Sequence, residues 1–207
     1  MQVLNNQLYV QRGEEFTLDF VLRNKDKSPY IVSSKLQNPY YLVTVSSGSQ
    51  DPAKRYILNQ WCMIPAAGTF FVTTPIRIPS VADWTGFADM KAAANADGCT
   101  VANYAIYYTV DNTTGTRKYY RYTGTDDSYN SSKMVEYVNR FTVTYNTATT
   151  MEWTELSYTY GIQLVSGKKR QEITSDGRQL LTFDTVYSIL PPTKLVVTSN
   201  IDGSLAN

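Results

Sequence analysis

The sequence predicts an all-β protein built as a sandwich of two sheets. Apolar and polar side chains alternate with a period of two over residues 15–23, 141–146 and 156–165, which is typical of strands with one buried face. Seventeen of the 207 residues are tyrosine, a residue that suits a pleated, half-buried surface. Hydrophobic residues make up 43% of the chain, so the chain can bury one substantial core.

Strand candidates follow one another at short spacing through the first eighty residues. In the clearest of them, which starts at Glu15, the apolar side chains share one face: Phe16, Leu18, Phe20 and Leu22. A turn at Asn24–Pro29 ends this strand, and further candidates lie at 40–46, 56–64 and 70–78. This succession of short strands and turns predicts an immunoglobulin-like β-sandwich.

The period changes between Ser80 and Ala96, where a single short helix is expected near residues 83–95. Large or apolar side chains recur there at intervals of three and four: Trp84, Phe87, Met90 and Ala94. Asp83 is a candidate cap at the start of the helix, and Asp97–Gly98 is a typical end.

A long β-hairpin is predicted after the helix. Tyr104–Val110 and Arg117–Thr123 flank the turn Asp111–Thr116, in which Gly115 suits a positive φ. Both faces of the hairpin carry bulky side chains, more than a ribbon lying on its own domain needs to cover. We therefore expect the hairpin to project and to contact another protein through six residues: Tyr107, Tyr108, Tyr119, Tyr120, Arg121 and Tyr122.

These elements predict one domain over residues 1–207. The sandwich is expected from residues 1 to about 80 and from about 140 to 207. The helix and the hairpin then form an insertion over residues 81–139.

The chain contains no histidine, which removes the commonest general base and the usual metal ligand. Catalysis by carboxylates alone remains open, with Glu152 and Glu155 or Asp126 and Asp127 as possible pairs. Four turn acids could contribute to a calcium site, but their spacing matches no known loop: Asp97, Asp111, Asp126 and Asp127. We expect no enzyme activity, no cofactor and no metal.

The formal net charge of +1 argues against a general electrostatic grip on nucleic acid. Arg117, Lys118 and Arg121 stand among tyrosines, as in proteins that stack on single strands, but this mixture also suits protein interfaces, which we favour. No apolar run approaches the roughly 18 residues that span a bilayer.

The first residues, Met1–Gln7, lack the basic and apolar regions of a signal peptide. We therefore expect synthesis in the cytoplasm. There, Cys62 and Cys99 would be reduced thiols.

The opening segment resembles the N-terminal immunoglobulin-like domain of tailed-phage upper baseplate proteins over roughly residues 7–45. The resemblance rests on Arg12–Gly13, the strand Glu15–Leu22, the charged turn Asn24–Lys27 and Ser28–Tyr30. The tyrosine-, threonine- and asparagine-rich, histidine-free chain is also similar to virion proteins of crAss-like phages.

The resemblance implies a virion protein of the neck, tail or baseplate, made and assembled in the cytoplasm of the host bacterium. Its partners would be further copies of itself, arranged as a homo-oligomeric ring, and other virion proteins such as portal, neck or tail components. The alternative is a carbohydrate- or receptor-binding β-sandwich module, in which exposed tyrosines and Trp61, Trp84 or Trp153 would stack on sugars.

Overall fold

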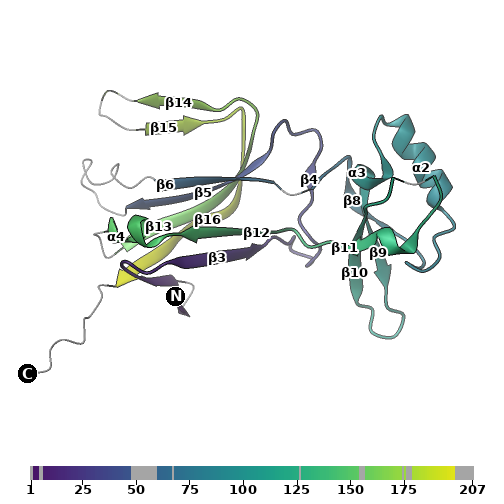
Figure 1. The fold of residues 1–207 in the computed structure, drawn as a ribbon, viewed down its shortest axis with the longest axis horizontal. Coiled ribbons are helices and arrows are strands. Elements are labelled where there is room, and N and C mark those ends of the chain that lie inside the picture. The colour runs from purple at the N-terminus through teal and green to yellow at the C-terminus, as the bar shows by residue number, and fades with distance from the viewer. Residues whose placement is uncertain are drawn as a thin grey trace, which may run out of the picture. The chain divides into compact units, whose positions relative to one another are not determined.

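Strands dominate the computed structural model, so the expected all-β class is confirmed. The structure describes residues 2–4, 7–47, 60–66, 68–125, 127–153, 157–173, 175 and 179–198. The chain divides into two compact units (Figure 1). The first comprises Met1–Asp19, Asn38–Pro65 and Thr142–Asn207, and the second comprises Phe20–Gln37 and Ala66–Phe141.

A six-stranded sheet forms one layer of the first unit. Its strands, in spatial order, are β1 (Gln2–Leu4), β2 (Gln7–Gln11), β16 (Thr185–Thr198), β13 (Ser157–Ser166), β5 (Tyr40–Ser47) and β6 (Gln60–Pro65). Every neighbouring pair is antiparallel except β16 and β2, which run parallel. The predicted strand at 156–165 is therefore the centre of this sheet, while residues 56–59 of the candidate strand at 56–64 lie outside the described residues.

The paired strands β3 (Phe16–Val21) and β12 (Arg140–Tyr145) carry the clearest period-two patterns of the sequence. The buried Phe16 stacks on Tyr145 at a centroid distance of 5.2 Å and meets Trp153 edge-on at 5.8 Å. Trp153 in turn lies 5.6 Å from Tyr158 of β13. Because Tyr158 belongs to the six-stranded sheet, this aromatic chain joins that sheet to the β3–β12 pair within one core.

Short helix α4 (Thr147–Met151) positions Trp153. The Asn146 side chain caps its start by accepting a hydrogen bond from the Thr149 backbone N–H. The buried Thr150 hydroxyl donates to the backbone oxygen of Glu14 at 3.0 Å, which ties this helix to the segment that precedes β3.

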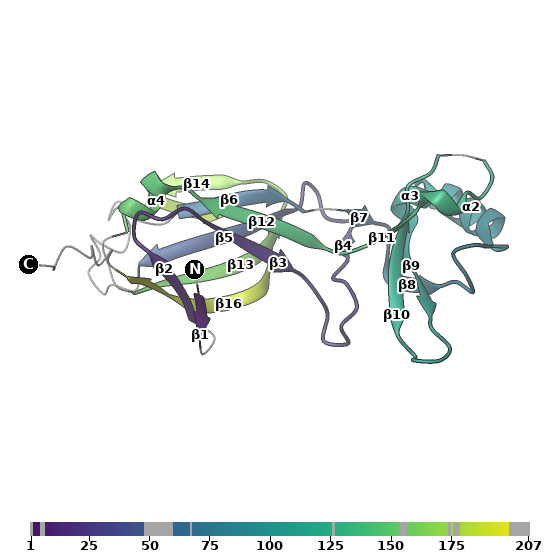
Figure 2. The same ribbon diagram turned by 60° about the horizontal axis from the view of Figure 1, so that its bottom comes forward.

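A two-stranded ribbon, β14 (Arg170–Ile173) with β15 (Gln179–Thr182), lies in the chain between β13 and β16 (Figures 1 and 2). Asp184 holds its base, because its carboxylate accepts from the Lys168 backbone N–H at 2.7 Å and pairs with the Arg170 guanidinium at 2.6 Å. All four side chains of β14 are exposed.

The second unit is built on a four-stranded sheet with the order β11 (Met134–Glu136), β10 (Arg117–Tyr122), β9 (Ala105–Val110) and β8 (Val72–Arg77). The predicted hairpin is confirmed as β9 and β10, in which Tyr107 opposes Tyr120 and Tyr108 opposes Tyr119. Strand β4 (Val32–Ser33) pairs in parallel with β7 (Thr69–Phe70) in the same unit.

Each face of this sheet has its own core. On one face, Trp84 and Phe87 pack with Tyr107 and Tyr122. On the other face, Ile31, Phe70 and Tyr137 pack with Ile106. The hairpin is thus the middle layer of the second unit, which explains why both of its faces carry large side chains.

The predicted helix is α2, which spans Phe87–Ala96. Its cap is Gly86 and not the expected Asp83, so the helix begins later than predicted. Its end at Asp97–Gly98 is as predicted: the Cys99 and Gly98 N–H groups donate to the carbonyls of Ala94 and Asn95. The expectation of a single helix is wrong. The described residues also form α3 (Val101–Tyr104), α4 and the 3₁₀ turn η1 (Ser131–Lys133).

The second unit contains all of the expected insertion at 81–139 but extends beyond it. Residues 20–37 and 66–80 also belong to this unit. They are included because Ile31 and Phe70 supply the core on one face of the sheet, a long-range contact that no local pattern predicts. Among the described residues, no helix is both long and apolar enough to cross a bilayer.

Candidate binding cleft in the second unit

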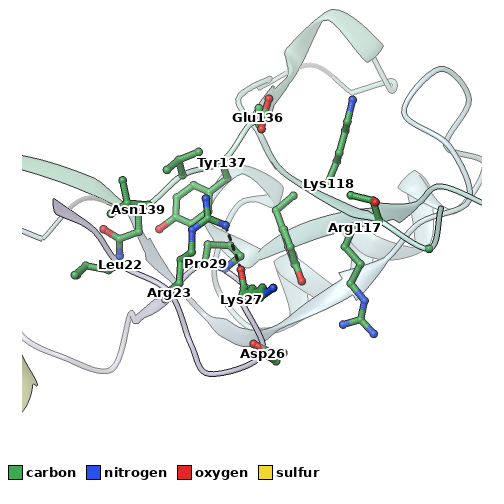
Figure 3. A pocket seen from close by; sticks show the side chains of 15 residues that line it. Leu22, Arg23, Asp26, Lys27, Pro29, Arg117, Lys118, Glu136, Tyr137 and Asn139 are labelled. Atoms are coloured by element: carbon green, nitrogen blue, oxygen red, sulfur yellow. Dashed lines mark hydrogen bonds between the residues drawn. The ribbon is translucent and has the colours of Figure 1, made fainter. Parts of the chain in front are cut away.

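A cleft of about 520 Å³ opens in the second unit, between the turn at Arg23–Pro29 and the start of strand β10 (Figure 3). The turn forms one wall, residues 115–119 form the other, and residues 136–139 lie between them. The volume is within the range of ordinary ligand pockets. All of the lining residues belong to the second unit.

The turn is held by its own hydrogen bonds. Asp26 accepts from the Ser28 backbone N–H at 3.0 Å and from the Ser28 hydroxyl at 2.6 Å. The Asn24 side chain donates to the same hydroxyl at 2.9 Å. The Ser28 bonds lower the pKa of Asp26, with a smaller contribution from the charge of Arg117. Asp26 is therefore ionised at neutral pH, and its carboxylate accepts hydrogen bonds from within the turn.

The facing wall carries a cation held over an aromatic pair. The guanidinium carbon of Arg117 lies 5.1 Å from the centre of the Tyr108 ring, within the range of a cation–π contact. Tyr108 and Tyr119 lie 5.8 Å apart across the hairpin. A hydrogen bond with Tyr119 and the nearby Tyr108 both raise the pKa of Arg117 above its ordinary value.

Tyr137 forms the buried floor between the two walls. Its ring meets Phe70 edge-on at 5.3 Å, and its backbone N–H donates to the Tyr119 carbonyl at 2.8 Å. Its hydroxyl is buried and has no hydrogen-bond partner among the described residues. Burial raises the pKa of Tyr137 to about 12.

The cleft is electropositive and its rim is partly apolar. Four cationic side chains line it, against the two carboxylates of Asp26 and Glu136: Arg23, Lys27, Arg117 and Lys118. Val21 and Val138 also line it and are 42% and 44% exposed. Aromatic residues, arginine and exposed aliphatic side chains together are typical of protein interfaces.

A second hollow, of about 560 Å³, lies in the same unit. Tyr120 and Lys118 line it together with the loop at 79–82. Neighbouring residues of a strand point to opposite faces, so Tyr119 contributes to the first cleft and Tyr120 to the second.

The structure separates the six predicted interface residues into two groups. Tyr107 and Tyr122 are 0% and 1% exposed and pack against Trp84 and Phe87, so their assignment to a surface contact is wrong. The reason is the helix that covers their face of the sheet. Tyr108, Tyr119 and Tyr120 are half-buried and Arg121 is exposed, and these four remain candidates.

The carboxylates proposed for catalysis or calcium are only partly within the described residues, and those that are described make separate contacts. Asp126 and Glu155 lie outside the described residues, and Glu152 is exposed. Asp111 accepts hydrogen bonds from the Thr113 and Thr114 N–H groups, while Asp127 pairs with Lys91. Within the described residues, no group of three or more histidine, cysteine or acidic side chains could hold a metal ion.

The tryptophans proposed to stack on sugars are mostly internal. Trp84 and Trp153 are 5% and 0% exposed, so they belong to the cores of the second and first units. Trp61 in β6 is half-buried. The thiols of Cys62 and Cys99 are free and lie in different units.

The local sequence pattern does not indicate that Arg23, Lys27 and Tyr137 belong to one site. The charged turn was visible, but its proximity to the hairpin depends on contacts between residues about ninety positions apart. Comparison with known proteins adds no assignment, since no family model, no curated protein and no solved structure matches this chain.

Proposed function

We propose that this chain is a structural protein of a tailed-phage virion that assembles through protein–protein contacts as a ring, neck, tail or baseplate component. The observation that carries the proposal is the surface of the hairpin in the second unit. Tyr108, Tyr119, Tyr120 and Arg121 present there the aromatic and arginine side chains that dominate interface energetics. The resemblance of residues 7–45 to phage baseplate domains supports the virion setting.

We infer that the first unit is an immunoglobulin-like sandwich. In that fold, one sheet contains strands G, F, C and C′ and the other contains B and E. The order β16-β13-β5-β6 fits the first set, and the pair β3–β12 fits the second. On this reading, the second unit is formed by the segments between B and C and between C′ and E.

The alternative function, a carbohydrate- or receptor-binding module, has less support. Sugar-binding sites of this kind need aromatic faces that are open to solvent, and Trp84 and Trp153 are core residues. A protein contact does not require an open aromatic face. The mixed apolar and cationic surface of the cleft and the hairpin is sufficient for it.

The proposal is tested by the size of the purified chain in solution, measured by light scattering over a wide range of concentrations. We expect one discrete oligomer, and we expect Tyr108→Ser with Arg121→Ser to dissociate it with little change in the melting temperature. The matched control is Tyr187→Ser with Lys168→Ser, which changes an exposed tyrosine and an exposed cation of the first unit.

A chain that stays monomeric at every concentration would contradict self-assembly. An oligomer that is equally sensitive to both pairs of substitutions would contradict the role of the hairpin. Binding of the monomer to a glycan array would favour the alternative module.

A further inference from the structure

We propose that the cleft between the turn at Arg23–Pro29 and strand β10 binds an acidic segment of a partner protein, whose carboxylates pair with the cations of both walls. This inference deepens the proposed function and rests on it, because it names the chemistry of the partner at one surface of an assembly protein.

The two arginines of the cleft are positioned before a partner arrives. Arg117 is held over Tyr108 and bonded to Tyr119. Arg23 donates from Nη1 to the Lys27 carbonyl at 3.3 Å. An arginine side chain has five N–H donors, so each guanidinium can still donate to a carboxylate. A guanidinium that is already placed loses less conformational entropy when it binds.

The carboxylates that line the cleft do not cancel its positive charge. Asp26 is turned toward Ser28, which donates two hydrogen bonds to it. Arg117 is close enough to Asp26 for the two charges to influence each other, yet no ion pair joins them among those that the described residues form. Lys118 and Glu136 are turned to the opposite side of the sheet from Arg117 (Figure 3). Of the cations that line the cleft, Arg23, Lys27 and Arg117 therefore face a ligand, and the carboxylate on their side is Asp26, which already accepts two hydrogen bonds from Ser28.

The lining favours a protein segment over a nucleic acid. Val21 and Val138 offer exposed apolar surface at the cleft, and Leu22 and Pro29 are buried beneath it. In a segment that alternates acidic and aliphatic side chains, the acidic groups would pair with the cations of the cleft and the aliphatic groups would contact Val21 and Val138. A nucleic acid needs a longer track of cations along its backbone, whereas this chain has a net charge of only +1.

The direct test uses two fluorescent octapeptides and the full-length chain. One peptide alternates glutamate and valine, and the other replaces each glutamate with glutamine. We expect only the acidic peptide to bind, as measured by fluorescence anisotropy, and we expect added salt to weaken it. Arg23→Gln with Arg117→Gln should weaken binding about tenfold, because two charge pairs are lost.

The matched control is Lys168→Gln with Lys169→Gln, which removes two neighbouring exposed cations from the first unit. It should leave binding unchanged, and both double variants should keep the parental melting temperature. An equal loss in both variants, or equal binding of both peptides, would overturn the inference. So would tighter binding of an oligothymidylate that depends on Arg23 and Arg117.

The two proposals fail separately. A chain that forms the expected oligomer but ignores the acidic peptide contradicts the partner chemistry alone. A chain that binds the peptide through Arg23 and Arg117 but never oligomerises contradicts self-assembly alone.

Discussion

The indole of Trp84 packs against the phenol ring of Tyr107, with ring centroids 4.6 Å apart. Trp84 precedes helix α2 and Tyr107 lies in strand β9, so the contact joins the helix to the hairpin inside the second unit. The Tyr107 hydroxyl is buried there without a hydrogen-bond partner among the described residues, and burial raises its pKa well above the ordinary value. Tyr107 therefore contributes apolar area to this core.

Tyr107→Phe and Tyr107→Ala should have opposite consequences for the second unit. The phenylalanine keeps the ring and removes an unpaired buried hydroxyl, so the free energy of unfolding should stay the same or rise by about 1 kcal/mol. The alanine leaves a cavity beside Trp84 and should cost about 3 to 5 kcal/mol. Urea unfolding followed by tryptophan fluorescence measures both changes.

The control for these substitutions is Tyr108→Ala, the next residue along β9, which is half-buried beside Arg117. It should cost clearly less than Tyr107→Ala. If the two alanine variants were equally destabilised, the assignment of Tyr107 to the core would be wrong.

Buried tyrosines should also make the protein sensitive to alkaline pH. Burial raises the pKa values of Tyr107, Tyr137 and Tyr145 above 10, and that of Tyr137 to about 12. Above pH of about 10, the unfolded chain releases protons that the folded chain keeps. The free energy of unfolding should therefore fall by about 1.4 kcal/mol per pH unit for each such tyrosine.

The measurement is denaturant unfolding at a series of alkaline pH values, with tyrosinate absorbance reporting ionisation. Tyr137→Phe removes one of the three groups. The free energy of unfolding should then fall less steeply with pH, by about 1.4 kcal/mol per pH unit. A stability that stayed constant between pH of about 10 and 12 would contradict the burial of these rings.

Local periodicity was sufficient to predict the strands β3, β12 and β13 and the end of the helix. Phe16 and Leu18 alternate with exposed residues in β3, and the observed burial follows the same alternation. The end of α2 at Asp97–Gly98 was likewise predictable, because a helix terminus depends on a few neighbouring residues.

Contacts between distant residues were not predictable from the same patterns. Ile106 and Tyr107 are adjacent, yet they enter different cores on the two faces of one sheet. A strand with two covered faces and a strand that projects toward a partner have the same bulky pattern, so the sequence could not separate them. The cleft depends in the same way on the approach of the turn at Arg23–Pro29 to β10.

The base of the β14–β15 ribbon should be rigid, and alanine substitutions at two glycines test this. Gly167 has a φ of +85°, and a Cβ there would clash with the Asp184 carboxylate. Gly115 has a φ of +70°, but a Cβ there would meet no atom within 4 Å. Gly115→Ala should therefore cost only the left-handed backbone penalty, about 1 to 2 kcal/mol. Gly167→Ala should cost more, because it also displaces Asp184 from the Lys168 N–H and from Arg170.

Thermal unfolding measures both costs, and limited proteolysis should cut the ribbon faster in Gly167→Ala alone. Equal costs with unchanged proteolysis would mean that Asp184 moves aside freely and does not hold the ribbon.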